Sequence, residues 1–188
     1  VLRDPLIRSW LLAGEGFRHF LFLDATGSAF YRPIQRLSFL WDYAWFGFEP
    51  TGWHATSMLV HAAAALALHA FARRLFSRFG LPPAAAFAAT WIWAIHPVHS
   101  SAVIYVSGRA DPLAALFGFL ALLAAVPAVE DPRRTPWGRL LGTGICLALA
   151  GLSKESGLMF GPLWLALRWT LGAGRSERGA AAAVVALV

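Results

Sequence analysis

The chain has 188 residues, of which 58% are hydrophobic and 14% are charged. Ordinary soluble domains carry ~45–50% apolar and ~25% charged residues, so this composition argues against a soluble domain and favours a protein embedded in lipid. The formal net charge of +6 comes mainly from arginines that flank separate apolar runs, which argues against nucleic-acid binding. A single cysteine offers neither a disulfide framework nor a thiolate metal site.

The first 52 residues are aromatic and polar, with no apolar run long enough to cross a bilayer. Residues 6–12 and 34–46 are typical of short amphipathic helices, and their aromatic side chains suit the lipid headgroup zone. We therefore expect residues 1–52 to form an extracytoplasmic loop with short surface helices. These helices should cover the mouth of a helix bundle, with Arg32 facing the turn at residues 96–111.

The remainder, residues 53–188, is predicted to form an all-α integral membrane domain, a multi-spanning helix bundle. The predicted crossings lie at about 53–75, 84–97, 112–127, 137–152 and 157–171, with the start of another at 179–188. These runs are short, so we expect some to extend into their polar flanks. Because the final run is too short to cross alone, we expect the chain to be a fragment of a longer membrane protein.

The arginines predict the orientation of the bundle. Three connections are rich in arginine, near residues 73–83, 130–139 and 172–179. The positive-inside rule places these connections in the cytoplasm. The remaining polar segments should then share the extracytoplasmic face, namely residues 1–52, 96–111 and 153–156.

The segment 96–111 gathers several ionisable side chains between two apolar runs. Such groups are costly at membrane depth and usually serve a site or line a wet cavity. Asp111 before Pro112 also fits a helix N-cap followed by proline at the first helical position, which is a purely structural role. Arg109 could hold a phosphate or pair with Asp111.

The histidines leave metal binding open as an alternative. His96 and His99 could supply two ligands for a divalent metal, or could form a hydrogen-bonded pair. His54, His61 and His69 lie along one stripe of the first crossing. At 1.5 Å rise per residue they are ~10 Å apart, too far to share one ion, so we expect interhelical hydrogen bonds instead.

The turn at residues 153–156 holds the only lysine of the chain. It could be a self-paired, solvated hairpin turn. Alternatively, Lys154 binds an anionic headgroup or pyrophosphate, while Glu155 pairs with Lys154 or with Arg109. Arg32 adds a cation on the same face, where contact with lipid headgroups would also explain it.

The polar motifs, in their order along the chain, resemble the transmembrane and tetratricopeptide-repeat-containing O-mannosyltransferases and their bacterial relatives. The motifs are Tyr31-Arg32-Pro33-Ile34, Asp42-Tyr43-Ala44, Gly52-Trp53-His54, His61, His96-Pro97-Val98-His99, Ala102-Val103, Gly108-Arg109-Ala110-Asp111 and Leu152-Ser153-Lys154-Glu155-Ser156-Gly157. The resemblance implies a C-type membrane glycosyltransferase that moves a sugar, with mannose as a candidate, from a polyprenyl-phosphate donor to a protein or glycan acceptor. It also implies a site on the extracytoplasmic face, and we expect a bacterial inner membrane.

Breaking a sugar–phosphate bond needs a base for the acceptor hydroxyl and cations for the departing phosphate. The expected phosphate ligands are Arg109, Lys154 and Arg32, and the expected supporting catalytic residues are Asp111 and Glu155. The expected site-lining residues are His96, His99 and His54. The resemblance places the main base in an acidic motif upstream of Val1, and tetratricopeptide repeats after the membrane part. Ser100-Ser101 stand where many relatives have threonine and glutamate, which weakens the case for a metal.

Two other function classes compete with the enzyme. A transporter or flippase predicts broken helices and charges near the bilayer midplane, whereas the charges here gather at one face. A non-catalytic membrane scaffold that presents repeats to partners is the other class. An acidic pair just upstream would favour the enzyme over the scaffold.

Overall fold

The computed structural model describes residues 7–12, 14, 31–126 and 137–171, and within these ranges every regular element is helical. The α-helices are α1 (Pro33–Phe46), α2 (Pro50–Ser77), α3 (Pro83–Ile95), α4 (Ser100–Ile104), α5 (Ala110–Ala125), α6 (Trp137–Ser153) and α7 (Phe160–Thr170). The 3-10 helices are η2 (Trp10–Leu12), η4 (Pro97–His99), η5 (Val106–Arg109) and η6 (Glu155–Met159). The all-α prediction is thus confirmed for the described residues. The predicted crossing that starts at 179–188 lies outside them.

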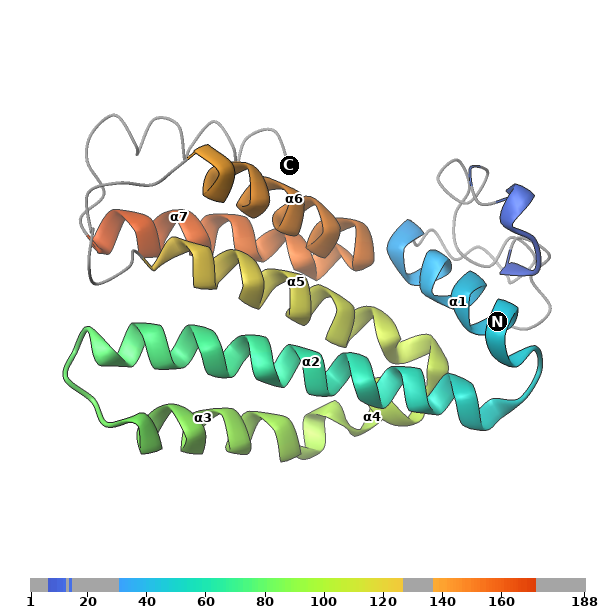
Figure 1. Cartoon of the computed structure of the whole chain (residues 1–188), viewed down its shortest axis with the longest axis horizontal. Helices are drawn as coiled ribbons and strands as arrows, with labels where there is room; N and C mark the ends of the chain where they lie inside the picture. Colours follow the sequence, from blue (N-terminus) through green and yellow to red (C-terminus); the bar gives the residue numbers. More distant parts are fainter. Residues whose placement is uncertain (1–6, 13, 15–30, 127–136, 172–188) are drawn as a thin grey trace.

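The long helices run back and forth along the long axis of the molecule (Figure 1). Helix α5 is central and packs against α2, α6 and α7, while α2 also packs against α3. Small side chains line these contacts, including Ala64 of α2 and Ala121 of α5, both of which are fully buried. Small residues let helix backbones approach closely, which matters in lipid because burial from water no longer drives helix association.

Prolines and one glycine define where several helices begin and reverse. Pro33, Pro50 and Pro83 are each the first residue of a helix. Proline suits that position because its φ is already helical and its missing N–H would have no partner within the helix. Between α2 and α3, Gly80 has a φ of 69°. Because side chains disfavour that conformation, glycine allows the tight reversal.

Two helical stretches are long and apolar enough to cross a membrane, Pro50–Ser77 and Val106–Ala125. In position they overlap the predicted crossings at 53–75 and 112–127. Helices α3 and α6 are apolar but shorter, so the number of crossings remains a prediction. The predicted crossing at 84–97 ends earlier, at Ile95, because His96 leaves the helical region with φ −62° and ψ 130°.

Helix α1 confirms the helix predicted at residues 34–46, but its two faces are unusual. Three polar side chains are buried on its inner face: Gln35, Arg36 and Asp42. Its outer face exposes aromatic rings, with Trp41 and Trp45 in contact at 5.9 Å between ring centroids. Helix α1 therefore directs its polar groups inward, toward the polar turns of the bundle.

Candidate functional site

The polar turns meet at one end of the bundle. The start of α1, the segment from α4 to the start of α5, and the α6–η6 turn all lie to the right of the middle of Figure 1. The α2–α3 connection, with its arginines, lies at the opposite end. The described parts of the polar segments are therefore grouped together, away from the α2–α3 connection. Which side of the membrane they face stays a prediction.

A first ion pair joins the start of α1 to the turn after α6. Arg32 Nη2 lies 2.8 Å from Glu155 Oε2, and Arg32 Nε lies 3.3 Å from both carboxylate oxygens. This forked contact holds the pKa of Glu155 below its usual range. The predicted partners of Glu155 were Lys154 and Arg109, and both are engaged elsewhere. Arg32 thus contacts the 153–156 turn, a partner that the sequence did not predict.

A second ion pair joins Lys154 Nζ to Asp111 Oδ1 and connects the 153–156 turn to α5. Asp111 is not the predicted N-cap, because η5 runs directly into α5 and the helix begins one residue earlier, at Ala110. Its carboxylate therefore lies in the first helical turn and binds the lysine. A carboxylate in this position is also favoured by the helix dipole.

Arg109 is enclosed within the fold. Its side chain has 0% exposure and its Nη1 lies 2.5 Å from Asp42 Oδ2. Arg109 Nε donates to Ser57 Oγ at 3.0 Å, and Nη2 donates to the Trp53 carbonyl at 2.7 Å. A desolvated guanidinium needs such partners. Arg109 therefore forms an internal ion pair with Asp42 in place of the predicted phosphate contact.

Asp42 was part of the family resemblance but was not predicted as a site residue. Burial raises the pKa of its carboxyl, and the charge of Arg109 opposes that rise. The available signal was an isolated carboxylate within an aromatic surface segment. A carboxylate of this kind is either exposed to water or paired with a cation, and Arg109, from a distant turn, is the cation that pairs with Asp42.

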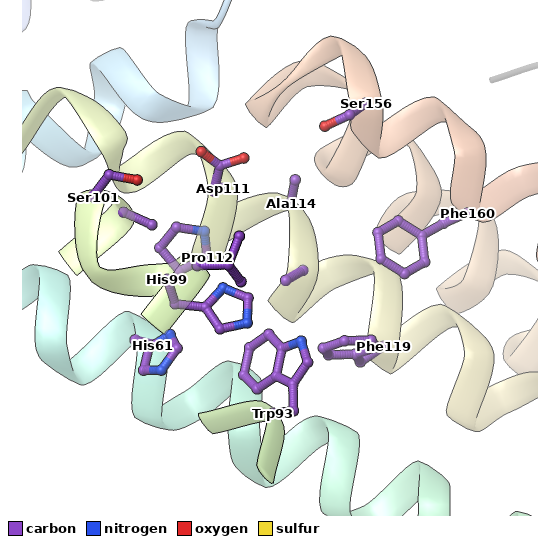
Figure 2. Close-up of a pocket in the computed structure, with 13 residues that line it drawn as sticks. His61, Trp93, His99, Ser101, Asp111, Pro112, Ala114, Phe119, Ser156 and Phe160 are labelled. Carbon is purple, nitrogen blue, oxygen red and sulfur yellow. The ribbon is translucent and has the colours of Figure 1, made fainter. Parts of the chain in front are cut away.

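A cavity of about 440 Å³ lies beside Asp111, between α2, α3, α5 and the turns (Figure 2). Its lining combines polar groups with aromatic rings: His61, Trp93, Val98, His99, Ser101, Ala102, Asp111, Pro112, Ala114, Ala115, Phe119, Ser156 and Phe160. Because Asp111 both lines the cavity and binds Lys154, the lysine belongs to the cavity rim. The cavity is large enough for a small polar ligand.

Two histidines and a tryptophan form one wall of the cavity. The centroid of the Trp93 ring lies 4.5 Å from that of His99 and 5.1 Å from that of His61, which is stacked at 17°. Burial, and then the nearby His61 and His96, lower the pKa of His99, while Asp111 opposes this effect. The lowered pKa favours the neutral imidazole, in which one ring nitrogen can accept a hydrogen bond.

The other histidines take different positions. His61 Nε2 lies 2.9 Å from the Ala94 carbonyl, and His69 Nδ1 lies 3.4 Å from Thr90 Oγ1, so the predicted interhelical hydrogen bonds are confirmed for these two. His96 accepts a bond from its own turn and lines a second cavity of about 410 Å³, which His61 and His99 also line.

His54, predicted to line the site, is exposed and borders neither cavity. His96 and His99, the proposed metal pair, have ring centroids 6.4 Å apart. Among residues 7–12, 14, 31–126 and 137–171, no group of three or more histidine, cysteine or carboxylate side chains could hold a metal ion.

Gly157 allows the tight turn that positions Lys154. A Cβ on Gly157 would lie 2.1 Å from the Ala150 carbonyl oxygen, so only glycine allows η6 to fold back against the end of α6. The Lys154 amide also bonds the Ala150 carbonyl at 3.2 Å. This close approach holds Lys154 and Glu155 next to one another at the rim.

Comparison with known proteins identifies related chains. The family model described as dolichyl-phosphate-mannose-protein mannosyltransferase matches residues 42–188. The chain is 33% identical over 148 residues to protein O-mannosyl-transferase Tmtc3 of Drosophila melanogaster, covering 68% of this chain and 16% of that protein. It is 35% identical over 134 residues to protein O-mannosyl-transferase TMTC2 of Mus musculus, with coverages of 68% and 15%. It is 32% identical over 149 residues to protein O-mannosyl-transferase TMTC4 of Homo sapiens, with coverages of 71% and 20%. The matched region is thus between 15% and 20% of these relatives' length. No solved structure matches the chain.

Proposed function

The chain belongs to the dolichyl-phosphate-mannose-protein mannosyltransferase family, and on that premise we propose that it forms the donor-binding part of a membrane mannosyltransferase. The donor is a polyprenyl-phosphate-linked mannose and the acceptor is a protein hydroxyl. The cavity at the polar end of the bundle receives the sugar and its phosphate. Since the chain spans a small part of its relatives, the activity is proposed for the whole protein.

The observation that supports this function is the meeting of two cations at one turn next to the cavity. The cavity lining includes Asp111, which binds Lys154, and Ser156, which follows Glu155 in the chain. Lys154 and Arg32 come from distant segments and each is held by a carboxylate, Asp111 and Glu155 respectively. Their side chains are 28% and 14% exposed, so both remain accessible to a ligand at the rim. A phosphate can bind these cations while the carboxylates keep them oriented.

The chemistry requires charge stabilisation at the leaving phosphate. The acceptor hydroxyl gives its proton to a general base while its oxygen forms a bond to the anomeric carbon. The bond from that carbon to the phosphate oxygen breaks, and the lipid phosphate departs with the electron pair. Cations held in advance at the rim stabilise that developing charge without having to reorganise. Within the described part of the chain, Lys154 and Arg32 are our candidates for this role.

The His99 imidazole and the Asp111 carboxylate line the cavity, and Asp111 also binds Lys154. Both can accept hydrogen bonds from sugar hydroxyls, and Ser101 and Ser156 can also donate them. These are the polar groups that a monosaccharide requires. We place the cavity on the extracytoplasmic side of the membrane because the arginine-rich connection lies at the opposite end. That this membrane is a bacterial inner membrane is a separate part of the proposal.

The test uses the full-length protein in membranes, with radiolabelled polyprenyl-phosphate-mannose and an acceptor protein. Lys154→Ala and Arg32→Ala should each lower the transfer rate by about ten- to a hundredfold, the effect of losing one charge-assisted contact in the transition state. The double variant should lose less than the product of the two if both cations hold one phosphate. Arg73→Ala is the matched control, since Arg73 is an exposed cation in the C-terminal part of α2, toward the opposite end.

Wild-type turnover in both single variants would contradict the assignment of the phosphate site. Insertion and expression are measured in parallel, so that a loss of protein is not counted as a loss of chemistry. A purified protein that transfers no mannose under any condition would contradict the enzymatic function itself and favour the membrane scaffold.

A further inference from the structure

The buried Asp42–Arg109 ion pair connects α1, which begins directly after Arg32, to the start of α5, where Asp111 binds Lys154. We propose that Asp42 and Arg109 form a positioning pair, which holds Arg32 and Lys154 at a fixed separation for the donor phosphate. The inference rests on the proposed function for its ligand. Its geometry, however, can be tested without any transfer activity.

The three ion pairs close a ring of contacts. Helix α1 begins directly after Arg32 and carries Asp42. Asp42 binds Arg109, which immediately precedes α5, and Asp111 in the first turn of α5 binds Lys154. Glu155, which follows Lys154 in the chain, binds Arg32 and so closes the ring. Because the ring is closed, we expect a shift of α1 relative to α5 to change the spacing of the two cations.

Arg109 also attaches this ring to the rigid bundle. Its Nη2 donates to the Trp53 carbonyl and its Nε to Ser57 Oγ, both on α2. Its guanidinium carbon lies 5.2 Å from the Phe39 ring centroid of α1, a distance at which a cation is attracted to an aromatic face. One guanidinium thus holds α1, α2 and the start of α5 together.

A second contact acts in the same place. Gln35 of α1 donates from Nε2 to the Ser107 carbonyl at 2.7 Å, beside the buried pair. Two polar links between the same elements fix their register more closely than apolar packing, which tolerates sliding. Buried ion pairs stabilise little compared with apolar packing, so a role in positioning explains why one occupies this interface.

The first measurement is a distance across the rim in the full-length protein. Cysteines replace Trp41 in α1 and Leu158 in η6, both exposed, in a Cys146→Ser background, and carry spin labels. Pulsed electron paramagnetic resonance should give one narrow distance distribution in this background. Asp42→Asn should broaden or shift that distribution, because the carboxylate that holds Arg109 is lost. A label pair at Leu66 and Phe87, on α2 and α3, should be unchanged.

The second measurement is the kinetics of transfer without labels. Asp42→Asn should raise the apparent KM for the lipid-linked donor by about tenfold while changing that for the acceptor by less than about twofold. Ser38→Ala is the matched control: it removes a hydroxyl 3.3 Å from Arg109 Nη1 and leaves the ion pair intact. A merely structural role would lower the amount of active enzyme and leave both KM values unchanged.

The outcomes separate the two proposals. An unchanged Trp41–Leu158 distribution in Asp42→Asn overturns the positioning role, whatever the kinetics show. A broadened distribution in a protein that transfers no mannose supports the positioning pair and contradicts the proposed function. If Asp42→Asn does not fold, Asp42→Glu carries the same measurements: it keeps the charge and displaces the carboxylate by one methylene, so a smaller broadening is expected.

Discussion

The buried Arg109–Asp42 pair and the two rim pairs, Arg32–Glu155 and Lys154–Asp111, each join a basic side chain to a carboxylate, but their surroundings are opposite. Arg109 and Asp42 are both 0% exposed, whereas Glu155 and Asp111 at the rim are 51% and 47% exposed. A charge removed from water depends on its partner, while an exposed charge is solvated with or without one. The comparison indicates that the buried pair supports the fold and that the rim pairs are available to a ligand.

The largest expected effect comes from removing one member of the buried pair. Arg109→Ala leaves the Asp42 carboxylate buried without its partner and should lower the free energy of unfolding by about 3–5 kcal/mol. The apparent Tm of the purified protein in detergent measures the loss. A change as small as that of a rim variant would contradict the distinction between the two environments.

The next largest loss of stability is expected from a substitution of Gly157, the glycine that allows the turn at the cavity rim. Gly157→Ala forces a Cβ against the Ala150 carbonyl and should cost about 1–3 kcal/mol, because the backbone has to move. Gly142→Ala in α6 is the matched control, since nothing lies within 4 Å of its added Cβ. That control should be neutral or slightly stabilising in the same thermal assay, because alanine favours a helix more than glycine does.

A smaller effect on stability is expected at the rim itself. Lys154→Ala removes a partly exposed pair and should change the free energy of unfolding by less than about 1 kcal/mol, while transfer falls as proposed above. Measuring Tm and transfer rate on one preparation sharpens the comparison. A large loss of stability would assign Lys154 to the fold rather than to the ligand.

The smallest effect is the pH response of the Arg32–Glu155 pair. Arg32 lowers the folded-state pKa of Glu155 below its ordinary value of 4.5. The pair therefore contributes its full stability above that value and loses it as the pH falls through the folded-state pKa. Titration of the ¹³C-labelled glutamate carboxyls by NMR should show the depressed pKa, and Arg32→Ala should raise it. An unchanged pKa in that variant would show that the pair does not form in solution.

The sequence predicted which charged residues belong to the candidate site, but it did not predict their partners. The motifs identified Arg32, Asp111, Lys154 and Glu155 as charged groups in turns, and the alternation of arginine-rich connections predicted that these turns share one end. The partners of these groups were not predictable. Side chains 123 residues apart in the chain, such as Arg32 and Glu155, are brought together only by helix packing.

The sequence by itself determined the helical fold and its environment, because apolar runs bounded by proline, glycine and arginine leave few other solutions. Only the tertiary structure decided which charge is buried. Arg109 and Lys154 look equivalent in sequence, since each has a carboxylate nearby. Close packing of α1 on α2 enclosed Arg109 with Asp42, while the turn at Gly157 left Lys154 at the cavity rim. Burial depends on what distant segments place around a side chain, and local sequence does not contain that information.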